Sequence, residues 1–155
     1  MEDFLKAGIA LALTTTAAIA DGHAQNWDMP MAYAATNYHS EQGVIFADRV
    51  REYTDGAINI TVHPGGSLFG GGDIKRAVQT GQVPIGERFM SAHANEAPLL
   101  GWDNLPFIAT SYADNAKLWD AARDSVNAQL ADLNLVALYT CPWPGQGFYF
   151  NKEVA

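Results

Sequence analysis

The feature that most constrains the fold of this chain is the alternation of strand-like and helix-like segments along it. Residues 27–33 and 57–63 carry apolar side chains at every second position, which is the period of a strand with one buried face. Residues 41–53, which follow a potential N-cap at Ser40, carry apolar side chains at helical spacing instead. A strand, a helix and a second strand in this order favour a parallel pair joined by a crossover helix.

The same order continues through the rest of the chain. A short helix is expected after the potential cap Asp73, and the apolar stretch 83–86 follows it as a third strand. Ser111 and Asp114 form a capping box at the start of a long amphipathic helix, and residues 135–141 follow as a further buried strand. We therefore predict an α/β fold whose mostly parallel sheet is covered by helices.

Length and charge narrow the range of functions. A chain of 155 residues with 48% hydrophobic content supports one ordinary core. It has 9 Lys and Arg residues against 17 Asp and Glu residues, a net charge of −8, and its basic residues form no cluster. Because binding to a phosphate backbone relies on concentrated positive charge, we expect no nucleic acid partner.

Residues 1–24 have the character of a secretory signal peptide. Lys6 precedes an apolar run rich in Ala and Thr, and cleavage after Ala24 would remove the whole segment. The alternative is a buried N-terminal helix, which the acidic residues Glu2 and Asp3 favour. The apolar run is too short to span a bilayer, so we expect export to the periplasm and no membrane insertion.

Three other motifs give little support to catalysis or to a cofactor. The glycine-rich stretch 65–72 lacks the Lys and Ser/Thr of a phosphate-binding loop, so we interpret it as a flexible connection. Cys141 has no histidine at a spacing that indicates a nucleophile, and it suits the end of a buried strand. His93 and Glu96 lack a third metal ligand and are expected on the surface or in a loop. We therefore predict no catalytic residue, no metal and no cofactor.

Two groups of residues are better candidates for ligand contact. Glu87 and Arg88 lie directly after the expected third strand, at the sheet edge where open α/β folds bind ligands. The alternative is an exposed ion pair, which contributes little stability. Trp143, Phe148 and Tyr149 lie close together beside Pro and Gly residues, which is typical of a packed corner or of the wall of a small-molecule site.

The order of these features is also that of a known family. The chain reads "TNYHSEQGVIFADRVREYTDGAINITVHPGGSLFGGG" from Thr36, then "QTGQVPIGE", "NLPFIATSYADNAKLWDA" and "LVALYTCPWPGQGFYFNKEV". Residues 27–155 thereby resemble the solute-binding proteins of TRAP-type (tripartite ATP-independent periplasmic) transporters. The most specific pieces are the region 58–86, the "LPF" at 105–107 and the "WPGQG" turn at 143–147.

The resemblance implies a two-lobed, periplasmic-binding-protein-like protein without catalysis. Such a protein closes on a small organic acid and passes it to a membrane permease. Residues 25–155 would then be the N-terminal solute-binding lobe of an incomplete two-lobe protein, with the tail "GFYFNKEV" as the strand that crosses to the second lobe. The family's principal carboxylate-binding arginine belongs to that second lobe, beyond Ala155.

By position, we expect six residues of this lobe to contact the ligand: Asn37, Tyr38, Glu87, Arg88, Trp143 and Phe148. The arginine would be a cationic partner of the carboxylate, the Asn and Tyr would be polar contacts, and the aromatic rings would select the ligand by shape.

Departures from the family pattern at Val83–Pro84 and at Gln146–Gly147 leave the identity of the organic acid open. Two alternatives for the function also remain. One is a binding protein of another uptake system, such as an ABC transporter. The other is a secreted hydrolase that uses Cys141 or Glu87.

Overall fold

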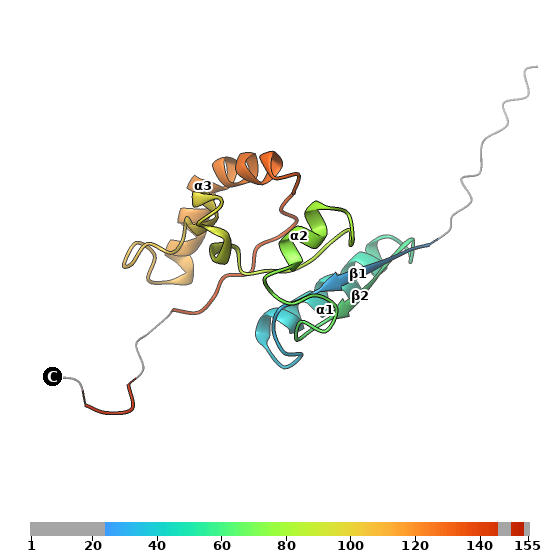
Figure 1. Cartoon of the computed structure of the whole chain (residues 1–155), viewed down its shortest axis with the longest axis horizontal. Coiled ribbons are helices and arrows are strands. Elements are labelled where there is room, and N and C mark those ends of the chain that lie inside the picture. Colours follow the sequence, from blue (N-terminus) through green and yellow to red (C-terminus); the bar gives the residue numbers. More distant parts are fainter. Residues whose placement is uncertain (1–23, 146–149, 154–155) are drawn as a thin grey trace, which may run out of the picture.

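The structure of the chain is a computed structural model that describes residues 24–145 and 150–153 (Figure 1). Its elements are, in chain order, β1 (Gln25–Pro30), α1 (Tyr38–Tyr53), β2 (Ile58–His63), α2 (Ile74–Gln79), the short 3-10 helices η1 (Met90–His93) and η2 (Pro98–Gly101), and α3 (Tyr112–Asp132). Figure 1 shows β1, β2 and α1 grouped together, with α3 beyond α2. The core is divided accordingly into two buried clusters, one around Met29 and Met31 and one around Val126 and Leu130.

Strands β1 and β2 form the parallel pair that the alternating pattern predicts. Their register runs from Gln25 opposite Ile58 to Pro30 opposite His63. Met29 and Met31 are fully buried, and both side chains pack in a cluster that also includes Phe46 of α1. Burial of a side chain of this size contributes about 1.5–3 kcal/mol, so this cluster is what holds α1 against the strands.

Helix α1 begins at Tyr38, earlier than the sequence predicts. Asn37 is its N-cap, and the side-chain oxygen of Asn37 accepts a hydrogen bond from the backbone N–H of His39 at 3.0 Å. Ser40 is buried instead, and its hydroxyl donates to the backbone carbonyl of Tyr33 at 2.8 Å. The prediction of a Ser40 cap is therefore wrong. Asn and Ser are equally good caps, and the contact with Tyr33 decides between them.

The glycine-rich stretch closes against the end of β1. Gly65 and Gly66 have φ angles of 68° and 69°, a region that glycine adopts without strain. The N–H of Gly65 donates to the carbonyl of Tyr33 at 2.6 Å, and the N–H of Gly66 donates to the carbonyl of Met31 at 2.9 Å. Because these amides are bonded within the protein, they are not available to hold a phosphate.

Helix α3 has both features predicted for it. The hydroxyl of Ser111 accepts from the N–H of Asp114 at 3.1 Å and lies 2.7 Å from the Asp114 carboxylate. On the apolar face, Val126 and Leu130 are buried together with Leu100 of η2. The capping box and the apolar stripe are confirmed, and the stripe builds the second core cluster.

Two segments predicted as strands do not join the sheet. Residues 83–86 form no ladder, and only the residue after them, Glu87, makes an isolated parallel bridge with Met31. Residues 135–141 are extended, but no described strand pairs with them. The α/β class and the parallel sheet are confirmed, whereas these two strand assignments are wrong. A strand needs a neighbouring backbone, and the periodicity of a segment does not reveal one.

Two other predictions fall on residues outside the described ranges. The signal peptide lies there except for its last residue, Ala24, and so do Phe148 and Tyr149 of the aromatic cluster. Within residues 24–145 and 150–153, no helix combines the length and the apolar character that crossing a membrane requires.

Candidate functional site

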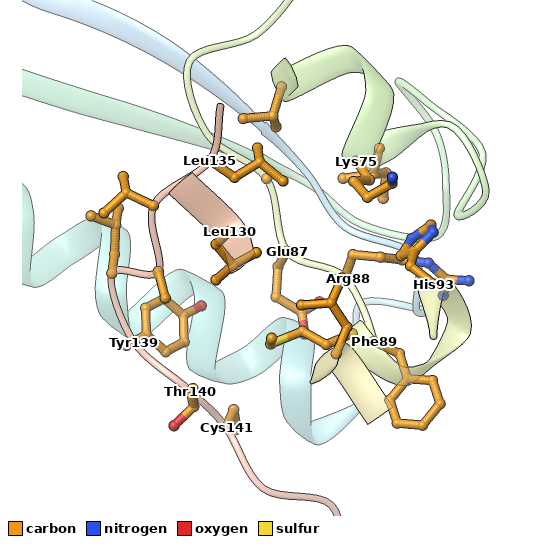
Figure 2. A pocket seen from close by; sticks show the side chains of 18 of the residues that line it. Lys75, Glu87, Arg88, Phe89, His93, Leu130, Leu135, Tyr139, Thr140 and Cys141 are labelled. Carbon is orange, nitrogen blue, oxygen red and sulfur yellow. The ribbon is translucent and has the colours of Figure 1, made fainter. Parts of the chain in front are cut away.

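A cavity of about 410 Å³ lies between the extended segments 83–89 and 135–143 (Figure 2). Met29, Leu100 and Leu130 contribute apolar wall from both core clusters. Polar side chains reach the cavity from α2, from η1 and from the stretch just before η1. A cavity of this size, mostly apolar with a few polar groups, is typical of a site for a small organic molecule.

Trp143 forms the aromatic corner of the cavity. Its ring centroid lies 4.1 Å from that of His39, 5.1 Å from that of Tyr33 and 5.7 Å from that of Phe89. The Tyr33 and Phe89 rings are nearly perpendicular to it, at 75° and 73°, which is the favourable edge-to-face arrangement. Trp143 is therefore held by rings from three separate parts of the chain.

Residues 139–143 are positioned by α1, along which they run. The ring of Tyr139 lies 4.7 Å from that of Phe46, and the hydroxyl of Tyr38 is close enough to the thiol of Cys141 to affect its pKa. Burial raises the pKa of Tyr139 to about 12, so its hydroxyl stays neutral at physiological pH. These contacts make one wall of the cavity a fixed surface of aromatic and polar groups.

Glu87 contributes an acidic group with few partners. Its Oε1 lies 3.8 Å from Nδ1 of the buried His39, too far for a hydrogen bond, and its Oε2 is buried without a hydrogen-bond partner. Burial raises the pKa of Glu87, although the charge of Arg88 opposes this, and burial lowers the pKa of His39. His39 is therefore neutral at pH 7, and its contact with Glu87 is not an ion pair.

Arg88 serves a different part of the site, because neighbouring residues of an extended segment point to opposite faces. Its guanidinium lies beside Tyr33, whose pKa is raised by burial and lowered by this cation. It also packs over Gly71, where an added Cβ would lie 3.4 Å from Nη1. Nε of Arg88 is buried without a partner. Figure 2 shows Lys75 and His93 on the same side of the cavity, so the cationic side chains at this end are Arg88 and Lys75.

His93 is buried, which corrects the prediction of a surface or loop position. Its Nδ1 lies 3.7 Å from Oε1 of Glu96, whose other oxygen pairs with Lys75. Burial first, and then the charges of Lys75 and Arg88, lower the pKa of His93. In the part of the chain that the structure describes, no group of three or more His, Cys, Asp or Glu side chains is placed to hold a metal ion.

We predict that Glu87→Gln raises the stability of the free protein at neutral pH. Because burial raises the folded-state pKa of Glu87, this group favours folding below the pKa of an unfolded Glu, and that contribution is lost as the pH rises through the folded-state pKa. A neutral amide avoids the cost of a buried charge. Urea denaturation should show a higher midpoint for the variant at about pH 7.5 and no gain at about pH 4.

The exposed Glu52→Gln is the matched control and should show no such pH-dependent gain. A lower midpoint for Glu87→Gln at neutral pH would contradict the prediction.

The structure brings three of the six predicted contact residues together. Glu87, Arg88 and Trp143 all line the cavity. Sequence reasoning missed two residues that surround them, His39 and Tyr33. Tyr33 ends the alternating pattern of the first strand and was assigned to packing, and no pattern distinguishes His39 from an ordinary residue in the first turn of a helix.

The other three predicted contact residues are placed differently. The side-chain oxygen of Asn37 is engaged in the N-cap of α1. Tyr38 lines a separate hollow of about 220 Å³ between α1 and residues 139–142. Phe148 lies outside the described residues. Contact of any of the six with a ligand stays a prediction.

Cys141 lacks the character of an activated nucleophile. Burial raises the pKa of its thiol, although the nearby Tyr38 hydroxyl works in the opposite direction. Since the thiolate is the reactive form, a raised pKa leaves little of it at neutral pH.

Comparison with known proteins gives the context of this site. Residues 31–149 match the family model of bacterial extracellular solute-binding protein, family 7. A marine metagenome TRAP solute-binding protein that is specific for pyroglutamate, solved with co-purified pyroglutamate, is 82% identical, with a TM-score of 0.83 over 84% of this chain and 43% of that chain.

Two receptors from Bordetella pertussis are also similar. DctP7, an extracytoplasmic solute receptor that binds pyroglutamic acid, is 39% identical over 84% of this chain and 44% of that chain, with a TM-score of 0.81. DctP6, also an extracytoplasmic solute receptor that binds pyroglutamic acid, is 39% identical over 77% of this chain and 40% of that chain, with a TM-score of 0.75.

The chain thus spans less than half the length of these relatives. The family match extends over most of the chain and includes both extended segments that border the cavity. The resemblance seen in the sequence is confirmed: this chain belongs to the bacterial extracellular solute-binding proteins of family 7, the TRAP solute-binding family.

Proposed function

We propose that this chain forms the N-terminal ligand-binding lobe of an extracytoplasmic receptor that captures pyroglutamate and delivers it to a TRAP-type membrane transporter. Pyroglutamate is a five-membered lactam that carries a carboxylate, so it is one of the small organic acids that the sequence predicts. The relative that is 82% identical to this chain has pyroglutamate as its ligand.

One observation carries the proposal: two residues that line the same mostly apolar cavity have buried polar atoms without hydrogen-bond partners. Oε2 of Glu87 and Nε of Arg88 are both buried without a hydrogen-bond partner, and both residues line the cavity. Buried polar atoms are normally satisfied, because an unpaired one loses its hydration without compensation. A small polar ligand in the cavity would lie beside both side chains.

The ligand would be enclosed by a second lobe. We propose that residues 1–24 are a signal peptide, that residues 25–155 form the first lobe, and that a second lobe supplies the remaining contacts and the main cation for the carboxylate. Closure of two lobes around a small ligand is the usual hinge mechanism of such receptors. The cationic end around Arg88 would assist by favouring an anion in the cleft.

The role in transport is binding and delivery without chemistry. The receptor would act in the periplasm and hand its ligand to the membrane permease subunits. The raised pKa of Cys141 supports a site that has no nucleophile. Recovery of chemically unchanged ligand after incubation with the protein would therefore accompany tight binding.

Calorimetry on a full-length receptor tests the proposal. The protein for this experiment is a hybrid in which this chain replaces the matching part of the relative that is 82% identical to it. Ligand that purifies with the hybrid is removed by unfolding and refolding. We expect a one-to-one complex with pyroglutamate. Arg88→Met should weaken binding about tenfold or more, because it removes a cationic donor from a buried site. Cys141→Ser should bind normally, because a hydroxyl keeps the contact with Tyr38.

Absence of pyroglutamate binding, or its conversion to another compound, would overturn the proposed function. If Arg88→Met bound pyroglutamate normally, Arg88 would have no part in binding, and the proposed function would stand.

A further inference from the structure

Within the proposed receptor, we infer that Glu87 determines specificity by accepting a hydrogen bond from the ring N–H of the bound lactam. This inference rests on the proposed function and adds to it one residue and one recognised group. The receptor would then select a cyclic amide acid over a ring of the same shape that lacks the N–H.

The backbone of Glu87 is held firmly at the cavity wall. Its N–H donates to the carbonyl of Pro30 at 3.0 Å, and it forms the bridge with the fully buried Met31. The preceding residue, Gly86, is tightly packed, since a Cβ there would lie 2.8 Å from Cγ2 of Ile74. A side chain that starts from so fixed a backbone can present its carboxylate in one place, which is a requirement for selective recognition.

The carboxylate of Glu87 is short of donors in the free protein. Oε2 has no hydrogen-bond partner, and the His39 nitrogen nearest to Oε1 is 3.8 Å away. His39 is itself 2% exposed, its ring packs against that of Trp143, and it is not among the residues that line the cavity. Glu87 itself lines the cavity, so a ligand bound there would lie next to its carboxylate.

The chemistry of a carboxylate decides what can fill this position. An ionised carboxylate only accepts hydrogen bonds, and a second carboxylate beside it in a buried site is repelled. The acid group of the ligand must therefore turn away from Glu87, towards Arg88 and the cationic end of the cavity. Pyroglutamate carries its N–H and its carboxylate on neighbouring ring atoms, so the carboxylate can point away from Glu87 while the N–H points towards it.

The test compares two ligands of the same shape. Pyroglutamate and its lactone analogue, 5-oxotetrahydrofuran-2-carboxylate, differ in that a ring oxygen replaces the N–H. We expect the full-length receptor described above to bind the lactam at least about 100-fold more tightly than the lactone, because a buried acceptor that is left unpaired discriminates strongly. In Glu87→Met the acceptor is gone, and the two affinities should agree within about threefold.

Two further variants separate recognition from a general loss of structure. Glu87→Gln keeps the shape of the side chain but can turn its NH2 group towards the lactone oxygen, so the preference should fall at least about tenfold. Glu52→Gln, on an exposed residue that does not line the cavity, should keep the full preference.

Each outcome is decisive. Equal affinity of the unmodified receptor for both ligands, or a preference that survives in Glu87→Met, would overturn the inference and leave the proposed function standing. If the unmodified receptor bound no pyroglutamate, the proposed function would fail and the inference with it.

Discussion

Gly43→Val is expected to destabilise the protein by about 2–3 kcal/mol, because it overpacks the first core cluster. Gly43 lies in α1, directly over the buried methionines. A Cβ there would lie 2.7 Å from Cε of Met31 and 3.3 Å from Cε of Met29. Both methionines are fully buried, so their side chains have little room to move aside. Urea denaturation followed by circular dichroism should show the loss as a lower midpoint.

Gly72→Val is the matched control for this prediction. A Cβ at Gly72 would meet nothing within 4 Å. The free energy of unfolding of Gly72→Val should therefore stay within about 0.5 kcal/mol of that of the unmodified protein. Equal midpoints for the two valine variants would show that α1 does not pack on the methionines as described.

Trp143→Ala is expected to weaken binding of pyroglutamate by the full-length receptor about 100-fold. Trp143 contacts three rings, and each such contact contributes about 0.5–1.5 kcal/mol beyond the area it buries. A total of about 3 kcal/mol corresponds to roughly two powers of ten in the dissociation constant if these contacts order the cavity wall for the ligand. Calorimetry measures this loss directly.

Trp143→Phe keeps an aromatic ring in the same corner and should lose less than about tenfold in affinity. If the Ala and Phe variants bound pyroglutamate equally well, the aromatic corner would have no part in ligand binding.

The candidate site was only partly predictable from sequence. Glu87 and Arg88 were found from their place at the end of an apolar segment, and both line the cavity. The sequence did not reveal that the two side chains point in different directions. An extended backbone turns neighbouring side chains to opposite faces, and this depends on the backbone conformation. His39 was missed because its burial depends on Trp143, which lies more than 100 residues further along the chain.

The sequence by itself determined the elements that depend on local interactions. Periodicity predicted β1, β2 and α3, and the box of Ser111 and Asp114 predicted where α3 begins. These features are local because a helix bonds within itself and a capping side chain reaches only the next few residues. The resemblance of several segments to a known family was also visible in the sequence, and the family match over residues 31–149 confirms it.

Tertiary structure decided everything that requires a distant partner. It chose Asn37 over Ser40 as the cap of α1, through a hydrogen bond from Ser40 to the Tyr33 carbonyl. It left residues 135–141 unpaired, although their composition suits a strand, because no described strand completes a ladder with them. The physical reason is the same in both cases. The free energy of a helix cap or of a strand depends on the groups with which it forms hydrogen bonds, and the sequence pattern of a segment does not identify those groups.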